Sequence, residues 1–170
     1  MNGGVDIDAV LQHMAQELRP LLSRNPTIIG IHTGGVWIAQ RLHAMLGLEE
    51  PIGTLDISFY RDDFTRIGMN PEVKASHLPI NINDRHIILI DDVLHTGRTI
   101  RAALNEIFDY GRPASVTLAV LVDRNDRELP IQANVVGHAM NLKKNQHVKL
   151  TSDSATGTGA LALNVQEVAP

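Results

Sequence analysis

The sequence predicts an α/β protein in which a parallel sheet is flanked by helices, within a single domain of residues 1–170. The first supporting observation is a set of continuous apolar runs at Thr27–Ile31, 87–90 and 115–122, which are typical of parallel strands covered on both faces. The second is that helical patterns separate these runs, as crossover connections require. The third is the length, which suffices for one hydrophobic core and is short for two.

The N-terminal part of the chain is predicted to form a helix that leads into the first strand. Asp6 or Asp8 can cap this helix, and apolar residues recur at helical spacing as far as about Ser23. Pro20 has no N–H donor, so we expect the last turn to kink or end there. The β-branched run Thr27–Ile31 then forms a central strand.

A second helix and a long polar segment follow the first strand. The helix is predicted to begin near Val36 and to end at Gly47. Residues 52–60 alternate between apolar and polar side chains, which predicts a strand. Residues 61–79 are polar and long for a loop in a compact domain, so we interpret them as a lid over a ligand site.

The C-terminal half is predicted to contain one more helix, a weak strand and a terminal hairpin. The helix begins near Arg98 and ends at Gly111. Residues 135–136 form the weak strand, and residues 147–150 pair with 161–165 around a turn rich in Gly and Thr. The apolar face of the helix comprises Ile100, Leu104, Ile107 and Phe108.

Residues 87–99 carry the most informative pattern, Ile-Ile-Leu-Ile-Asp-Asp-Val-Leu-His-Thr-Gly-Arg-Thr. A buried strand ends on Asp91 and Asp92, and a short loop with Gly97 leads into a helix. The free N–H groups at a helix N-terminus favour a phosphate, and glycine allows the backbone to approach it. Carboxylates can accept hydrogen bonds from sugar hydroxyls and can hold Mg²⁺ through its water shell. The pattern therefore predicts a ribose 5-phosphate site with a magnesium ion beside it.

Two other loops are predicted to lie at the same edge of the sheet. Thr33, Gly34 and Gly35 follow the first strand and form a second strand-to-helix junction with N–H groups available to an anion. Residues 123–127 form a charged loop after another strand. Right-handed crossovers bring the carboxyl ends of parallel strands together, so the three loops would line one crevice.

Composition limits the other functions that the chain could have. The formal charge is −4, with no long block of like charge, so nothing global suggests nucleic-acid binding. The absence of cysteine excludes disulfides and thiolate metal ligands, and the eight histidines show no zinc-ligand spacing. No run is long enough to span a membrane and no signal pattern is evident, so we expect a cytoplasmic protein.

The pattern at 87–99 closely resembles the phosphoribosyl pyrophosphate (PRPP) signature of type I phosphoribosyltransferases. Three further segments resemble one branch of them, the PyrR family of pyrimidine operon regulators that are also uracil phosphoribosyltransferases. These segments are 55–63 (Leu-Asp-Ile-Ser-Phe-Tyr-Arg-Asp-Asp), 111–113 (Gly-Arg-Pro), and 120–124 (Val-Leu-Val-Asp-Arg) running on to 127–131. The similarity covers about residues 27–136 and implies a type I phosphoribosyltransferase-like sheet with a small hood formed by the termini.

The resemblance implies that the chain converts uracil and PRPP to UMP and pyrophosphate, and that it responds to UMP or UTP. Asp91 and Asp92 would contact the ribose and hydrated Mg²⁺, Arg61 would stabilise the leaving group, and Arg124 would lie near the nucleobase. Pyrophosphate would face Thr33, Gly34 and Gly35. The remaining residues of the PRPP and UMP site would be Val93, Leu94, His95, Thr96, Gly97, Arg98 and Thr99. We also expect a homo-oligomer, because an apolar N-terminal helix and a terminal hairpin suggest association.

Four residues depart from the family pattern and leave alternatives open. Gly34 stands where a basic residue is usual, which raises the alternative of a nucleotide-sensing regulator with weak or no catalysis. Asp126 and Gln132 stand where basic residues are expected in members that bind leader RNA, so RNA binding is expected to be weakened. His95 replaces an aromatic residue. A purine phosphoribosyltransferase is a weaker alternative, because segment 55–63 does not suit it.

Overall fold

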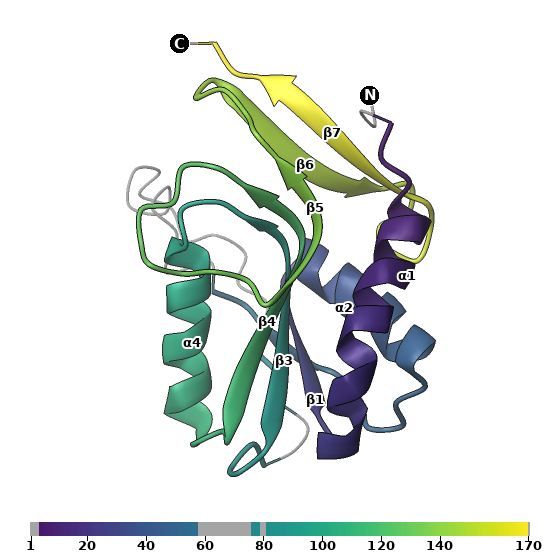
Figure 1. Cartoon of the computed structure of the whole chain (residues 1–170), viewed down its shortest axis with the longest axis vertical. Coiled ribbons are helices and arrows are strands. Elements are labelled where there is room, and N and C mark those ends of the chain that lie inside the picture. The colour runs from purple at the N-terminus through teal and green to yellow at the C-terminus, as the bar shows by residue number, and fades with distance from the viewer. Residues whose placement is uncertain (1–3, 58–75, 79–80, 170) are drawn as a thin grey trace.

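The computed structural model describes residues 4–57, 76–78 and 81–169. Five parallel strands form the central sheet in the order β2-β1-β3-β4-β5 (Figure 1). This arrangement confirms the predicted α/β class with a parallel sheet. The strands are β1 (Thr27–Ile31), β2 (Gly53–Leu55), β3 (His86–Leu94), β4 (Ser115–Arg124) and β5 (Val135–Met140).

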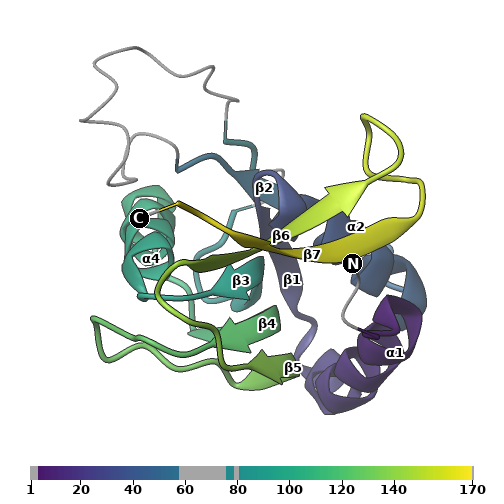
Figure 2. The same ribbon diagram turned by 90° about the horizontal axis from the view of Figure 1, so that it is seen from above.

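Helices cover both faces of the sheet. Helices α1 (Ile7–Leu18) and α2 (Gly34–Leu46) lie on one face, and α4 (Arg98–Tyr110) lies on the other (Figure 2). Successive side chains of β3 point to opposite faces, as strand geometry requires. Ile88 and Ile90 therefore belong to the core beneath α1 and α2, whereas the residues between and before them pack toward α4.

The first helix is shorter than predicted. Asp6 caps it, with a side-chain oxygen that accepts a hydrogen bond from the Ala9 N–H at 3.2 Å. The α-helix ends at Leu18 instead of near Ser23, which confirms the end expected around Pro20, and a 3₁₀ helix, η1 (Arg19–Arg24), continues the chain. The proline at the start of η1 explains the change, because it cannot donate to the α-helical ladder.

The strand predicted at 52–60 is also shorter, since β2 ends at Leu55. The next N–H, that of Asp56, donates to Ser76 Oγ at 3.0 Å, and Thr54 forms an isolated antiparallel bridge with His77. Ser76 therefore takes the Asp56 N–H that a longer strand would have used. Residues 58–75 and 79–80 lie outside the described residues, so the predicted lid at 61–79 stays a prediction.

Strand β3 is longer than predicted, and this changes the position of the acidic pair. Its ladder with β4 continues through Asp91, opposite Val120, to Leu94, opposite Asp123. Asp91 and Asp92 therefore lie within β3, near its carboxyl end, and not in the loop after the strand. Strand β5 likewise extends well beyond residues 135–136.

Helix α4 begins at Arg98 as predicted, but its apolar face is narrower. Ile100 and Ile107 are buried and Leu104 is partly buried against them. Phe108 is 57% exposed, which corrects its assignment to the buried face. The physical reason is that the residue after Ile107 lies about 100° further around a helix.

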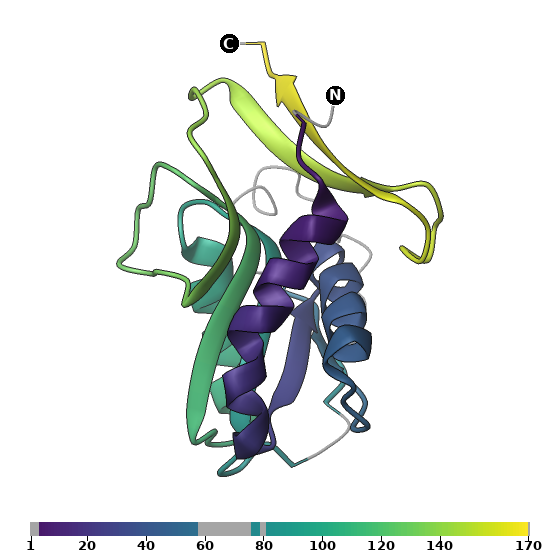
Figure 3. The ribbon, with the colours of Figure 1, turned by 45° about the vertical axis from the view of Figure 1, so that its right-hand side comes forward.

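A two-stranded antiparallel hairpin, β6 (Gln146–Ser152) and β7 (Leu161–Glu167), lies over the carboxyl ends of the sheet strands (Figures 1 and 3). We call this hairpin the hood. The N-terminal stretch before α1 lies next to it, so the predicted hood of terminal residues is confirmed. Within residues 4–57, 76–78 and 81–169, no helix combines the length and apolar composition needed to cross a bilayer.

Candidate functional site

The loops that follow β1, β3 and β4 meet at the carboxyl edge of the sheet. β3 lies between β1 and β4, and all three strands run in the same direction. The predicted crevice is therefore built around the end of β3, with the hood above it (Figure 1). The peptide bond between His32 and Thr33, at the start of the loop after β1, is cis.

The acidic pair is held rigidly at this edge. Asp91 is only 4% exposed, and its Oδ1 accepts a hydrogen bond from the Asp92 N–H at 2.8 Å. Asp92 Oδ1 accepts in turn from the Val93 N–H, also at 2.8 Å. Each carboxylate is therefore oriented by the backbone of the residue that follows it, which reduces the conformational entropy that a ligand would otherwise have to remove.

The glycines after β1 are packed directly against the acidic pair. A Cβ atom on Gly34 would lie 2.8 Å from Asp92 Cγ, and a Cβ atom on Gly35 would lie 2.6 Å from the Ile90 carbonyl oxygen and 3.1 Å from Asp91 Cα. Real Cβ atoms do not tolerate the backbone contact at Gly35, and at Gly34 the Asp92 side chain would have to move. The glycines thus allow the N-terminus of α2, which begins at Gly34, to approach the end of β3.

The loop after β3 has the form expected of an anion cradle. Gly97 has φ +95°, in the left-handed region that favours glycine, and α4 begins at the next residue. The Arg98 N–H donates to Thr96 Oγ1 at 3.2 Å. A 13-residue helix therefore presents its N-terminal N–H groups to the crevice, where they favour a negative charge.

The loop after β4 braces the loop after β3 from outside. The carbonyl oxygen of Thr96 accepts hydrogen bonds from the N–H groups of Glu128 at 2.9 Å and Leu129 at 3.0 Å. Ile131 and Leu129 also close the space in front of Gly97, where an added Cβ would lie 3.1 Å from Ile131. The anion cradle is therefore fixed by residues about thirty positions away in the chain.

Arg127 is the centre of this brace. Its Nη1 donates to the carbonyl oxygens of His95 at 2.9 Å and Arg124 at 3.2 Å, and its Nε donates to the Ile131 carbonyl oxygen at 2.7 Å. Its Nη2 pairs with Asp123 Oδ1 at 2.9 Å. One planar guanidinium thus ties together the end of β3, the end of β4 and the loop that follows.

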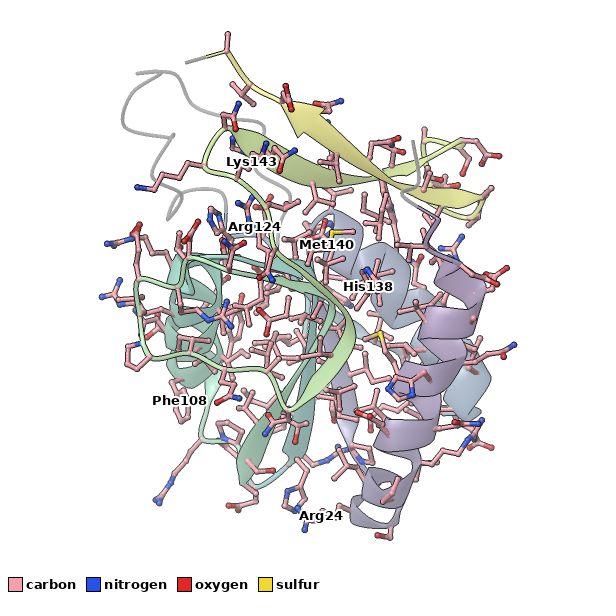
Figure 4. All side chains as sticks on the ribbon, turned by 45° about the horizontal axis from the view of Figure 1, so that its top comes forward. Arg24, Phe108, Arg124, His138, Met140 and Lys143 are labelled. Carbon is pink, nitrogen blue, oxygen red and sulfur yellow. The ribbon has the colours of Figure 1, made fainter. Side chains whose placement is uncertain are left out.

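A pocket of about 320 Å³ opens between these loops and the hood. Arg124 lies in it, 4% exposed, below β6 (Figure 4). Its Nη1 donates to the Gln146 carbonyl oxygen at 3.0 Å, whereas its buried Nε has no acceptor among the described residues. The residues that line the pocket are His95, Thr96, Arg124, Asp126, Arg127, Glu128, Lys144, Gln146 and His147.

The electrostatics of the pocket favour a neutral imidazole. Partial burial lowers the pKa of His95, and the positive charge of Arg124 lowers this pKa further. Burial also lowers the pKa of Arg124, but a guanidinium stays charged at any physiological pH. His95 is therefore uncharged at neutral pH and can accept a hydrogen bond at one ring nitrogen.

The structure brings most of the predicted site residues to one edge of the sheet. The acidic pair, the glycines after β1 and residues 95–99 surround the end of β3, and Arg124 lies one strand away in the pocket. Arg61 lies outside the described residues. Sequence reasoning missed Lys144, Gln146 and His147, because no motif indicates where a terminal hairpin will fold back over a sheet.

Comparison with known proteins agrees with this architecture. Residues 6–154 match the family model described as "Phosphoribosyl transferase domain". The chain is 56% identical to "Bifunctional protein PyrR" of Nitrosococcus oceani, over 98% of this chain and 94% of that protein. The chain belongs to the PyrR family of phosphoribosyltransferases. A PyrR protein of Pseudomonas paraeruginosa is 53% identical over 95% of this chain and 94% of its own length.

Solved structures share the fold at lower identity. The purine phosphoribosyltransferase of Pyrococcus horikoshii superposes with a TM-score of 0.62 at 24% identity, covering 79% of this chain and 82% of its own. A structure described as "Analysis of an invariant aspartic acid in HPRTs, glutamic acid mutant" superposes with a TM-score of 0.67 at 18% identity, covering 92% and 89%. This chain therefore shares its fold with those structures.

Proposed function

We propose that this chain is a pyrimidine-responsive regulator that also acts as a uracil phosphoribosyltransferase, converting uracil and PRPP to UMP and pyrophosphate. The observation that carries the proposal is the end of β3. It places two oriented carboxylates next to a helix N-terminus and opposite two glycines. A phosphorylated pentose has the matching groups, which are a phosphate for the N–H groups and vicinal hydroxyls for the carboxylates.

We place the 5′-phosphate on the N–H groups and hydroxyls of residues 94–99 and the ribose hydroxyls on Asp91 and Asp92. Pyrophosphate would face Thr33, Gly34 and Gly35, where backbone N–H groups start α2. Val93 and Leu94 connect the two halves of this site along β3. The nucleobase would then occupy the pocket beneath the hood, beside Arg124 and His95.

The donor set suits Mg²⁺, a hard cation that prefers carboxylate oxygens. Asp91 and Asp92 would hold it, mostly through water, since no cluster of three or more His, Asp or Glu side chains forms among the described residues. When bound, the ion would neutralise negative charge on the departing pyrophosphate. The close approach of Gly34 to Asp92 leaves the carboxylates facing the loop that would receive that pyrophosphate.

The contribution of the protein to this reaction would be positioning and electrostatic stabilisation. No side-chain nucleophile is needed, because the anomeric carbon of PRPP passes through a state with positive charge as pyrophosphate leaves. Asp91 and Asp92 would favour that charge, and the N-termini of α2 and α4 would bind the pyrophosphate and the 5′-phosphate respectively. Arg61 would stabilise the leaving group, and closure of the segment 61–79 would exclude water, which otherwise hydrolyses PRPP.

The alternative of a sensor without useful turnover is not favoured. A larger residue in place of Gly34 would meet the Asp92 carboxylate, which would then have to move, so the glycine lets α2 begin close to the acidic pair. The curated relatives are also named bifunctional. Regulation by UMP or UTP would use the same pocket. A nucleotide bound there would shift the protein toward the conformation that binds it better.

Four further proposals follow from the chain as a whole. We propose a single domain over residues 1–170, a cytoplasmic location and a homo-oligomer. The apolar face of α1 does not itself support association, because Leu11 and Met14 are buried within the chain.

Leader RNA remains a candidate partner, although Asp126 and Gln132 are exposed and bring no positive charge. A filter-binding titration against pyrimidine-gene leader RNA over a salt series would test it, and the absence of salt-sensitive binding would exclude it.

The catalytic proposal is tested by PRPP-dependent conversion of labelled uracil to UMP. Wild-type protein should turn over, and a protein with both Asp91→Asn and Asp92→Asn should lose at least about a hundredfold in kcat/KM. Arg112→Gln, an exposed change at the opposite end of α4, is the matched control and should retain activity. Wild-type turnover with an unimpaired double variant would show that the site assignment is wrong.

A further inference from the structure

Glu106, on α4, has a carboxylate that is only half satisfied by hydrogen bonds. Its Oε1 accepts from Ser76 Oγ at 2.5 Å, whereas its Oε2 is buried and has no hydrogen-bond partner among the described residues. A buried carboxylate oxygen without a donor reduces stability, and an apolar side chain at this position of α4 would avoid that cost. The presence of a glutamate here therefore points to a role other than stabilising the fold.

A continuous series of hydrogen bonds runs from Glu106 to the loop after β1. Ser76 Oγ donates to Glu106 and accepts from the Asp56 N–H at 3.0 Å. This N–H belongs to the same peptide group as the Leu55 carbonyl oxygen, and that oxygen accepts from the His32 N–H at 2.9 Å. His32 is the first residue after β1, so the series ends where the loop begins.

The hydrogen bonds of this series all have the same polarity, with the carboxylate as the final acceptor. Hydrogen bonds in series polarise one another, and an ionised acceptor strengthens the bond that it receives. The charge of Glu106 therefore strengthens the contact between Ser76 and the peptide, and through the peptide the contact with His32. The peptide is held on both sides, which fixes the point at which the loop after β1 leaves the sheet.

We propose that Glu106 and Ser76 position the loop after β1 for a diphosphate ligand. They act through the peptide between Leu55 and Asp56. The ligand class is inorganic pyrophosphate or the diphosphate group of PRPP. This inference rests on the proposed function, because that function places the diphosphate on residues 33–35. Both side chains are positioning residues, which act through the backbone and not on the ligand itself.

The other half of the site does not depend on this series of hydrogen bonds. Ribose 5-phosphate would bind the acidic pair and the loop after β3, which is braced from the loop after β4. Glu106 lies well past the first turn of α4, away from the N-terminal N–H groups of that helix. Loss of the series should therefore weaken diphosphate binding and leave ribose 5-phosphate binding intact.

Calorimetry with magnesium pyrophosphate, PRPP and ribose 5-phosphate tests the proposal without turnover. Ser76→Ala and Glu106→Ala should each weaken the binding of pyrophosphate and PRPP about tenfold, because each removes a hydrogen bond to a charged group. The affinity for ribose 5-phosphate should stay within about twofold of wild type, the usual limit for independent sites. Ser76→Thr keeps the hydroxyl and Glu106→Gln keeps an acceptor oxygen, so both should retain most of the diphosphate affinity.

A double variant distinguishes one shared series from two separate effects. With both Ser76→Ala and Glu106→Ala, the loss of pyrophosphate affinity should exceed that of either single variant by no more than about twofold. Additive losses of about a hundredfold would mean that the two residues act separately, which would overturn the proposal. Ser23→Ala in η1 and Glu17→Ala in α1 are matched controls at exposed positions and should bind all three ligands as the wild type does.

Hydrogen exchange supplies a readout that needs no ligand. In Ser76→Ala the His32 amide should exchange about tenfold faster, whereas the Leu89 amide in the middle of β3 should keep its protection. Equal loss of protection at both amides, or equal weakening of pyrophosphate and ribose 5-phosphate binding, would show a general effect on folding and overturn the inference.

The inference and the proposed function fail in different ways. Alanine variants that keep the wild-type affinity for pyrophosphate and PRPP would overturn the inference alone, because the wild type would still bind its ligands. A wild-type protein that binds none of the three ligands would refute the proposed function, and the inference with it.

Discussion

The carboxylate of Asp92 fills the space in front of Gly34, such that a Cβ atom on the glycine would lie 2.8 Å from Asp92 Cγ. This contact joins the loop after β1 to the end of β3. The loop proposed to face pyrophosphate is therefore in direct contact with a carboxylate proposed to bind the ribose. A basic residue in place of Gly34 would require either this carboxylate or the start of α2 to move.

Replacement of Gly34 by alanine is therefore expected to damage the site without unfolding the protein. The new methyl group must displace Asp92 or the start of α2, and a displacement of about 1 Å can cost about a hundredfold in rate. Steady-state kinetics should show a fall in kcat/KM for PRPP of that order. Thermal unfolding should place the midpoint within a few degrees of wild type. An alanine variant with wild-type kinetics would contradict the observed packing.

Replacement of Arg127 by glutamine should loosen the anion cradle. The change removes donors to the His95, Arg124 and Ile131 carbonyl oxygens together with the ion pair to Asp123. The loop after β3 would then sample more conformations, so we expect KM for PRPP to rise about tenfold or more, with a smaller change in kcat. Arg24→Gln, an exposed change, is the control and should leave both constants unchanged. If the Arg127 variant instead lowers kcat about tenfold and leaves KM unchanged, Arg127 does not act by positioning the loop.

The hood is attached to α2 through Arg41. Its Nη1 donates to the Gly157 carbonyl oxygen at 2.7 Å and its Nη2 donates to the Gly159 carbonyl oxygen. Replacement by glutamine should cost about 1.5–3 kcal/mol locally, the range for hydrogen bonds to a charged group. Hydrogen exchange should show lost protection at residues 152–159 while the amides of β3 stay protected. Uniform loss across both regions would mean that the hood does not open separately.

His95 gives stability a defined dependence on pH. Its pKa is lowered in the folded state from the ordinary 6.5, so the unfolded chain binds more protons as pH falls below that value. This group therefore leaves stability unaffected above pH 6.5 and reduces it as pH falls toward the folded-state pKa. Urea titrations at pH 7.5 and 5.5 should show a smaller loss in His95→Asn than in wild type, and an equal loss would contradict the assignment.

Much of the fold follows from local chain chemistry. Continuous β-branched runs are typical of strands covered on both faces, and this identified β1, β3 and β4. The glycine at 97 and the polar loop before it identified the α4 N-terminus. Element ends were less predictable. The strand expected at 52–60 ends at Leu55 because its partner β1 ends at Ile31, opposite Leu55, and the next N–H, that of Asp56, donates to Ser76 Oγ in a distant segment.

The sequence by itself determined that a buried strand carries two acidic residues near its carboxyl end and that a glycine-containing loop leads from it into a helix, because strand burial, helix capping and glycine conformation are properties of neighbouring residues. Only the tertiary structure decided that Gly34 lies against Asp92, that Arg127 ties three segments together and that the hood closes a pocket over His95 and Arg124. These relationships depend on how separate elements pack, and packing distances between distant segments leave no periodic signal in the chain.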